Sequence, residues 1–139
     1  MARTLLLLAL LASAGARQGQ SIFGRWRTGD GKAIVSIERC GPRACGTVAT
    51  VLDPAAPKLD THNPDRALRQ RRLVGLRILS DFMPEGDDWR HGRAYDPSSG
   101  RSYAARLSLG DDGRLAVTGC VLFLCRTQYW TRVTAADAS

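Results

Sequence analysis

Hydrophobic and polar residues alternate along short segments over most of the chain. The clearest case is residues 101–109, where Tyr103 and Leu107 fall on one face and Ser102 and Arg106 on the other. A period of two is typical of a half-buried β-strand. Such segments, bounded by Gly, Pro and Asp, predict eight strands: residues 22–28, 32–40, 45–52, 73–80, 89–95, 101–109 and the two arms of a hairpin after residue 113.

One long connection, residues 53–72, interrupts this pattern. Its three prolines exclude a strand. Within it, Asn63 and Pro64 have the character of an N-cap and a first helical residue, and predict a short helix over residues 63–70. Residues 81–88 are acidic and contain a proline and a glycine, so we expect a loop there.

The first and last strands carry a matching pattern. Alternation places Gly24 and Trp26 on one face of the first strand, and Trp130 and Arg132 on one face of the last. If these strands are neighbours, Arg132 can lie over the Trp26 indole as a cation–π contact, and the sheet closes. We therefore expect an all-β fold, an eight-stranded antiparallel up-and-down barrel, although a two-sheet sandwich fits the same alternation.

Four cysteines predict two disulfides, Cys40–Cys45 and Cys120–Cys125, each closing a hairpin. Treating each pair as directly opposite fixes two registers. The first sets residue 38 against 47 and 36 against 49; the second sets residue 118 against 127 and 115 against 130. In both hairpins the cysteines fall on the more polar face, so we expect the disulfides outside the barrel. A zinc site is the alternative, but four intervening residues is a loose spacing for it.

The N-terminal segment resembles a secretory signal peptide. Residues 1–16 hold one Arg, an apolar run and a small-residue cleavage site ending at Ala16. No stretch is long enough to span a bilayer as a helix. We expect an exported, periplasmic or secreted protein whose single domain is residues 17–139, present as a monomer or weak dimer.

The charge is basic and almost entirely arginine. The whole chain has 20 Lys and Arg against 13 Asp and Glu. Exposed aromatic residues are not interleaved with this charge, so we expect a solvated outer surface and no nucleic-acid partner. A local cluster over residues 66–77 could face acidic lipid headgroups or an anionic ligand.

Several ordered motifs resemble the DUF2147 family of exported bacterial proteins. They are Gly24-x-Trp26, Asp30-Gly31-Lys32, Cys45-Gly46, Asp60-x-x-Asn63-Pro64, Gly75-Leu76, Tyr95-Asp96-Pro97-x-x-Gly100-x-x-Tyr103, Leu115-x-Val117-x-Gly119 and Trp130-x-Arg132. The first and last of these also resemble the lipocalin and calycin pattern. The resemblance implies a calycin-like barrel in the bacterial periplasm that binds a small ligand, in a family without an established activity.

The predicted register gives candidate ligand contacts. Gln128 and Arg126 are polar residues on the inward face, where they would orient a small amphipathic or apolar ligand. Trp130 and Leu115 would supply apolar contact, and Tyr95 and Tyr103 would form the rim. The competing interpretation is that these groups satisfy one another in a filled core. We assign Gly24, Trp26 and Arg132 to barrel closure.

The sequence contains little that is typical of an active site. Asp60 and Asp96 could act as paired carboxylates of a hydrolase, but hydrogen bonds that order the neighbouring turns explain both. His62 and His91 have no evident partners. We expect no enzyme activity, cofactor or metal. The alternative function is a protein-interaction module, an inhibitor or envelope-assembly factor that uses its loops around a solid core.

Overall fold

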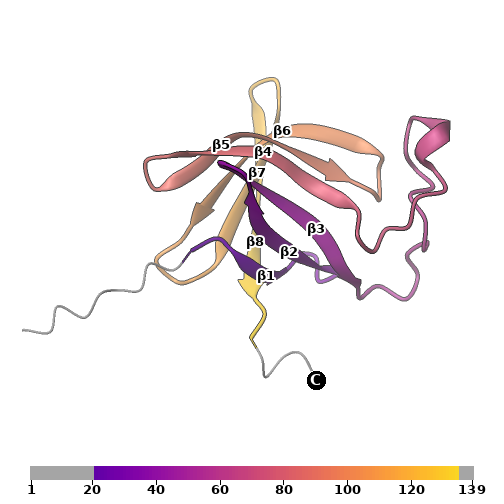
Figure 1. Cartoon of the computed structure of the whole chain (residues 1–139), viewed down its shortest axis with the longest axis horizontal. Coiled ribbons are helices and arrows are strands. Elements are labelled where there is room, and N and C mark those ends of the chain that lie inside the picture. Colours follow the sequence, from indigo (N-terminus) through magenta and orange to yellow (C-terminus); the bar gives the residue numbers. More distant parts are fainter. Residues whose placement is uncertain (1–20, 135–139) are drawn as a thin grey trace, which may run out of the picture.

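The structure is a computed structural model, and it describes residues 21–134. Eight strands form one closed antiparallel barrel (Figure 1). They are β1 (Gly24–Arg27), β2 (Ala33–Cys40), β3 (Arg43–Val51), β4 (Arg77–Glu85), β5 (Asp88–Asp96), β6 (Arg101–Leu109), β7 (Leu115–Val121) and β8 (Leu124–Arg132). Each strand pairs with the next in the chain, so the up-and-down barrel is confirmed and a sandwich is excluded. The predicted signal peptide lies outside the described residues.

The barrel closes where the sequence predicts. Trp26 pairs with Arg132 across β1 and β8, and the Arg132 guanidinium carbon lies 4.2 Å from the centre of the Trp26 ring. The same guanidinium donates to the carbonyl oxygens of Phe23 (3.0 Å) and Ser21 (2.5 Å). Gly24 has a φ of +124°, and a Cβ there would be 3.0 Å from Arg132 Nη1. A side chain at position 24 would therefore displace the guanidinium from the indole.

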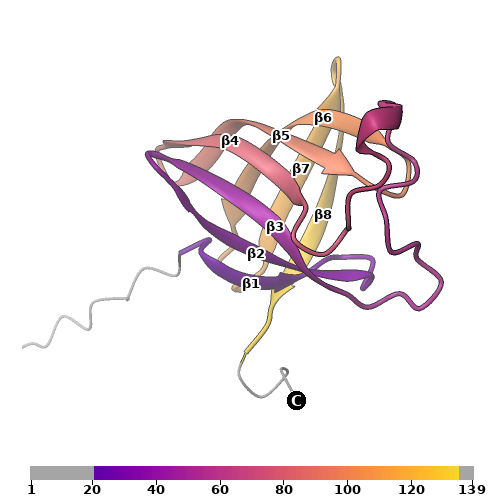
Figure 2. The ribbon, with the colours of Figure 1, turned by 45° about the vertical axis from the view of Figure 1, so that its right-hand side comes forward.

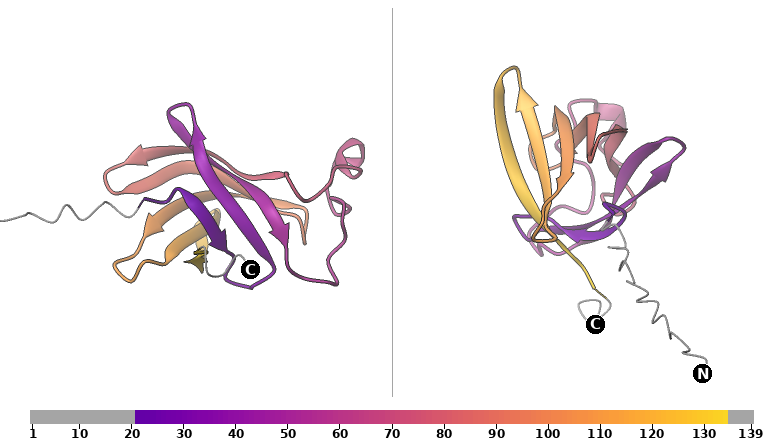
Figure 3. Two further views of the ribbon diagram at one scale, coloured as in Figure 1. Left: turned by 60° about the horizontal axis from the view of Figure 1, so that its bottom comes forward. Right: turned by 90° about the vertical axis from the view of Figure 1, so that its left-hand side faces the viewer.

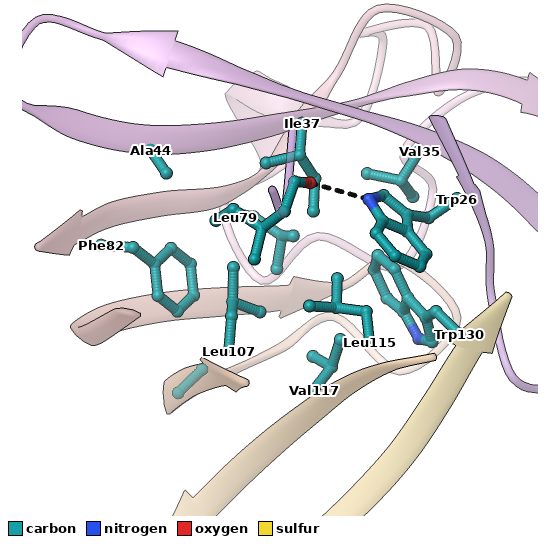
Figure 4. Packing of buried hydrophobic residues seen from close by; sticks show 12 residues of the cluster. Trp26, Val35, Ile37, Ala44, Leu79, Phe82, Leu107, Leu115, Val117 and Trp130 are labelled. Atoms are coloured by element: carbon teal, nitrogen blue, oxygen red, sulfur yellow. Dashed lines mark hydrogen bonds between the residues drawn. The ribbon is translucent and has the colours of Figure 1, made fainter. Parts of the chain in front are cut away.

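Fully buried side chains fill one end of the barrel. This closed end carries the β2–β3, β4–β5 and β6–β7 turns (Figure 2). The core includes Trp26, Val35, Ile37, Leu79, Phe82, Leu107 and Leu115, shown in Figure 4. Gly92 allows Phe82 into this core, because a Cβ on Gly92 would be 2.3 Å from Phe82 Cδ1. Burial of these side chains supplies the main stabilising free energy of the fold.

The fourth strand differs from the prediction. It spans Arg77–Glu85 instead of residues 73–80, and residues 81–85 continue the strand where a loop was expected. Pro84 is compatible with this strand because β3 pairs with β4 only as far as Phe82. Beyond that point β4 has a single neighbour, β5, so the missing N–H of Pro84 costs no ladder bond on the β3 side.

The first hairpin has a different register from the predicted one. Cys40 lies opposite Arg43 across a two-residue turn, and Glu38 lies opposite Cys45. The prediction placed the two cysteines opposite each other; the disulfide forms, but diagonally. Because the shift is two residues, the side chains between Val35 and Val48 keep their predicted faces. A bulge between Ile34 and Val35 changes the register beyond them, and Val51 lines the cavity although the prediction placed it outside. In the second hairpin, the register around Cys120–Cys125 is confirmed throughout.

The predicted helix is only a single 3₁₀ turn, η1 (Arg66–Leu68). Its cap is Asp65, whose side chain accepts from the backbone N–H of Ala67 at 3.0 Å. Asn63, the predicted cap, accepts instead from the N–H of Asp65 at 2.9 Å. This side-chain bond orders the chain before the turn but does not start an α-helix.

Candidate functional site

The end of the barrel opposite the filled core is hollow. A cavity of about 1050 Å³ lies there, bounded by the late residues of β3, β5 and β7 and the early residues of β4, β6 and β8. Its apolar wall includes Val48, Val51, Ile78, Leu79, Ala94 and Val117. Trp130 lies between the cavity and the buried core, on the same side of the core as Trp26 in Figure 4. The interior is therefore a cup with an apolar floor.

Five of the six residues that the sequence proposes as ligand contacts line this cavity. They are Tyr95, Tyr103, Arg126, Gln128 and Trp130. The sixth, Leu115, is fully buried opposite Trp130 and belongs to the floor beneath. The sequence placed Gln128, Arg126, Trp130 and Leu115 on the inward face and the two tyrosines at the rim; only the structure separates the hollow end from the filled end.

Gln128 is held in place by its neighbours. Its side-chain oxygen accepts from Trp130 Nε1 at 2.5 Å and from the N–H of Gly29 at 3.3 Å. No other hydrogen bond involves this side chain, so its amide NH₂ is available in the part of the chain that the structure describes. The Gly29 contact also joins the β1–β2 turn to β8.

Two arginines at the cavity have unpaired guanidinium groups. Arg126 projects from β8 opposite Gly119, and Arg101 projects from the start of β6. Within residues 21–134, neither guanidinium takes part in a hydrogen bond, ion pair or ring contact. Tyr103, whose ring packs on Gly119, also has no hydrogen bond to its hydroxyl. The cavity therefore offers cationic and neutral donors, alongside the carboxylates of Asp30, Asp53 and Asp96, which accept hydrogen bonds from their own turns.

The cavity rim is braced by a buried carboxylate. Asp60 is fully buried and accepts from Tyr95 Oη at 2.5 Å, Asn63 Nδ2 at 2.8 Å and Arg71 Nη2 at 3.1 Å. Burial alone would raise the pKa of Asp60, but these three bonds outweigh it and lower the pKa. Burial and the bond to this carboxylate raise the pKa of Tyr95 to about 12.

This arrangement gives the two carboxylates structural roles. Asp60 ties the 53–72 connection to β5, and its oxygens are occupied by three donors. Asp96 accepts from the backbone and hydroxyl of Ser98 and from the hydroxyl of Ser99, which orders the β5–β6 turn. Both carboxylates lie at the open end of the barrel, and each accepts hydrogen bonds from neighbouring residues. In the described part of the chain, no three His, Cys, Asp or Glu side chains gather as a metal site would need.

The site also contains residues that sequence reasoning missed. Arg101 was not proposed. It follows the β5–β6 turn and lies two residues before Tyr103, so alternation places it on the same face as Tyr103 and could have indicated it. Lys32 and His62 also border the cavity. The prediction began a strand at residue 32, but Lys32 lies just before β2. His62 lies in the 53–72 connection, where alternation gives no information on direction.

Comparison with known proteins agrees with this architecture. A solved structure titled "Protein HP1028 from the human pathogen Helicobacter pylori belongs to the lipocalin family" superimposes with a TM-score of 0.76 at 22% identity, covering 84% of this chain and 86% of that chain. No curated protein matches the chain. No helix in the described residues has the length and apolar character needed to cross a membrane. Residues 24–132 match the family described as "Uncharacterized protein conserved in bacteria (DUF2147)", and the chain therefore belongs to the DUF2147 family.

Proposed function

We propose that this protein binds a small amphipathic ligand with an acidic head group, non-covalently, inside the cup. The apolar tail would lie against Val117 and Trp130, and the head group would lie near Arg101 and Arg126. We further propose that residues 17–139 act as one exported domain in the periplasm. Two disulfides are consistent with an oxidising compartment, and the family is bacterial.

The observation that carries this proposal is the combination of an apolar cavity with unpaired cations at its edge. A cavity of about 1050 Å³ matches the upper range of pockets that hold small ligands, roughly 300–1,000 Å³. Guanidinium groups bind carboxylate and phosphate strongly because both can form two parallel bonds. A purely apolar ligand would leave these donors unused.

The alternative, an interaction module with a solid core, is less well supported. That function was expected to go with a filled interior, whereas half of this barrel is hollow. The lipocalin-like fold supports ligand binding only by analogy, because one fold serves many functions.

A fluorescence titration with dansyl-labelled undecanoate tests the proposal. We expect enhanced emission on binding, and displacement by dodecanoate in preference to dodecanol or dodecyltrimethylammonium. Arg101→Gln and Arg126→Gln should each weaken dodecanoate binding by about tenfold, because each removes one charge-assisted contact.

Arg93→Gln is the matched control. Arg93 is exposed and lies opposite Ala104 on β6, outside the cavity, so its loss should leave the affinity unchanged. Equal displacement by the anionic, neutral and cationic competitors would contradict the acidic head group. No saturable binding of any of them would contradict ligand binding altogether.

A further inference from the structure

The β7–β8 turn exposes four consecutive apolar residues. Val121, Leu122, Phe123 and Leu124 are 54%, 88%, 90% and 75% exposed, respectively. We call these four residues the apolar tip. Figures 1 and 2 show the tip projecting beyond the other strands at the top of the molecule, and Figure 3 (right) shows its hairpin flaring from the wall. Exposed apolar groups of this kind mark an interaction site.

Folding does not explain why these residues occupy the turn. Leu122 has a φ of +54°, a left-handed conformation that favours Gly, Asn or Asp. The chain does use glycine at the opposite end of the barrel, where Gly41 (φ +65°) and Gly86 (φ +59°) form the other two tight hairpins. The Cys120–Cys125 disulfide joins the two strands at the pair next to the tip, and so restricts the conformation of the turn.

In the described part of the chain, arginines without partners gather at the same end of the barrel as the tip. Five arginines at the open end have side chains with no hydrogen bond, ion pair or ring contact among residues 21–134: Arg66, Arg72, Arg77, Arg101 and Arg126. Acidic residues occur at both ends: Asp30, Asp53, Asp65 and Asp96 lie in or beside the connections of the open end, and Asp87, Asp111 and Asp112 lie in those of the closed end. The open end therefore presents unpaired cations and apolar side chains together, while its carboxylates Asp30, Asp53 and Asp96 accept hydrogen bonds from their own turns.

We propose that the apolar tip inserts into the surface of a bilayer that contains anionic phospholipid, with the open end of the cup facing the headgroups. Apolar side chains that enter the interface, next to arginines that meet lipid phosphates, are the combination that peripheral membrane attachment requires. Val121 and Leu124 belong both to the tip and to the cavity lining, so an apolar surface continues from the bilayer into the cup. The docking does not depend on the proposed ligand.

Vesicle flotation of the ligand-free protein tests the docking. We expect it to float with phosphatidylcholine vesicles that contain phosphatidylglycerol, to bind pure phosphatidylcholine much less, and to be released by salt. The double variant Leu122→Asn, Phe123→Gly replaces the tip with a favourable turn sequence and should fold at least as well. Its vesicle partition should fall by about tenfold or more, because two buried apolar side chains are lost.

Tyr129→Ser is the control, since Tyr129 is a 50% exposed aromatic residue on β8, several residues from the tip. Its partition should match that of the unchanged protein. Unaltered flotation of the tip variant would overturn the proposal. A second outcome would also overturn it: neither protein floats, and size-exclusion chromatography shows a dimer that dissociates in the tip variant. That result would assign the tip to contact with a second copy of the chain. We expect the tip variant to bind dansyl-undecanoate as the unchanged protein does, which would show that its loss of vesicle binding does not come from damage to the cavity.

Discussion

At the residue scale, Tyr95 is the group whose ionisation the fold opposes most clearly. Its hydroxyl donates to the buried Asp60 carboxylate, and its pKa rises from 10.0 to about 12. The folded state thus keeps a proton that the unfolded state releases. The stabilisation is complete below about pH 10 and is lost as the pH rises from 10 to about 12.

Tyrosinate absorbance measures this directly, since the chain has three tyrosines. We expect one of them to ionise near pH 12, and Tyr95→Phe to remove that late step alone. If the variant instead loses an early step, the Tyr95–Asp60 bond is not the cause of the shift.

Arg132 is the second residue with a predictable energetic role. Arg132→Met keeps the aliphatic stem over Trp26 but removes the cation and two bonds to backbone carbonyls. We expect a loss of about 2 kcal/mol in the free energy of unfolding, measured in urea. Arg114→Met is the control: Arg114 lies 4.6 Å from the Tyr129 ring but does not join the terminal strands. Its loss should stay below about 1 kcal/mol, and equal losses would contradict a closing role for Arg132.

At the scale of elements, β8 is an incomplete member of the barrel. It pairs with β7 along its whole length but with β1 only at Thr131 and Arg132. Residues 124–130 therefore have one neighbouring strand, and about half of their amides point away from it. Val133 adds one further bond, from its N–H to the carbonyl of Arg25 at 2.9 Å.

Hydrogen exchange followed by mass spectrometry should reveal this edge. About half of the amides of residues 124–130 should exchange early, whereas β7, flanked on both sides, should be protected. Uniform slow exchange of β8 would mean that something covers the edge in solution, such as a second copy of the chain.

At the scale of the whole molecule, alternation and turn residues predicted eight antiparallel strands but were compatible with both a barrel and a sandwich. Gly24, Trp26 and Arg132 indicated which strands meet, because a large indole beside a residue without a side chain must be buried by a group from a neighbouring strand. The extent of β4 could not be predicted, since the tolerance of Pro84 depends on where β3 stops pairing. The register of the first hairpin depended on whether the turn or the disulfide fixed the pairing, and the turn did.

The sequence predicted which side chains of the candidate site point into the barrel, but not at which level of the barrel they lie. Alternation correctly pointed Gln128, Arg126 and Leu115 inward. It could not separate Leu115, packed in the filled end, from Arg126, which lines the cavity, because that difference depends on the total volume of side chains at each level of the barrel. The Asp60 cluster joins two distant segments, so no local pattern shows it.

The short first strand has one further consequence. β1 has four residues where β8 has nine, so Leu124 and Arg126 line the cavity from a part of β8 that pairs with β7 alone. The hydrogen-bonded wall is therefore incomplete on one side of the open end. We expect this end to accommodate ligands with apolar tails of different lengths, so that selection depends mainly on the charged head group.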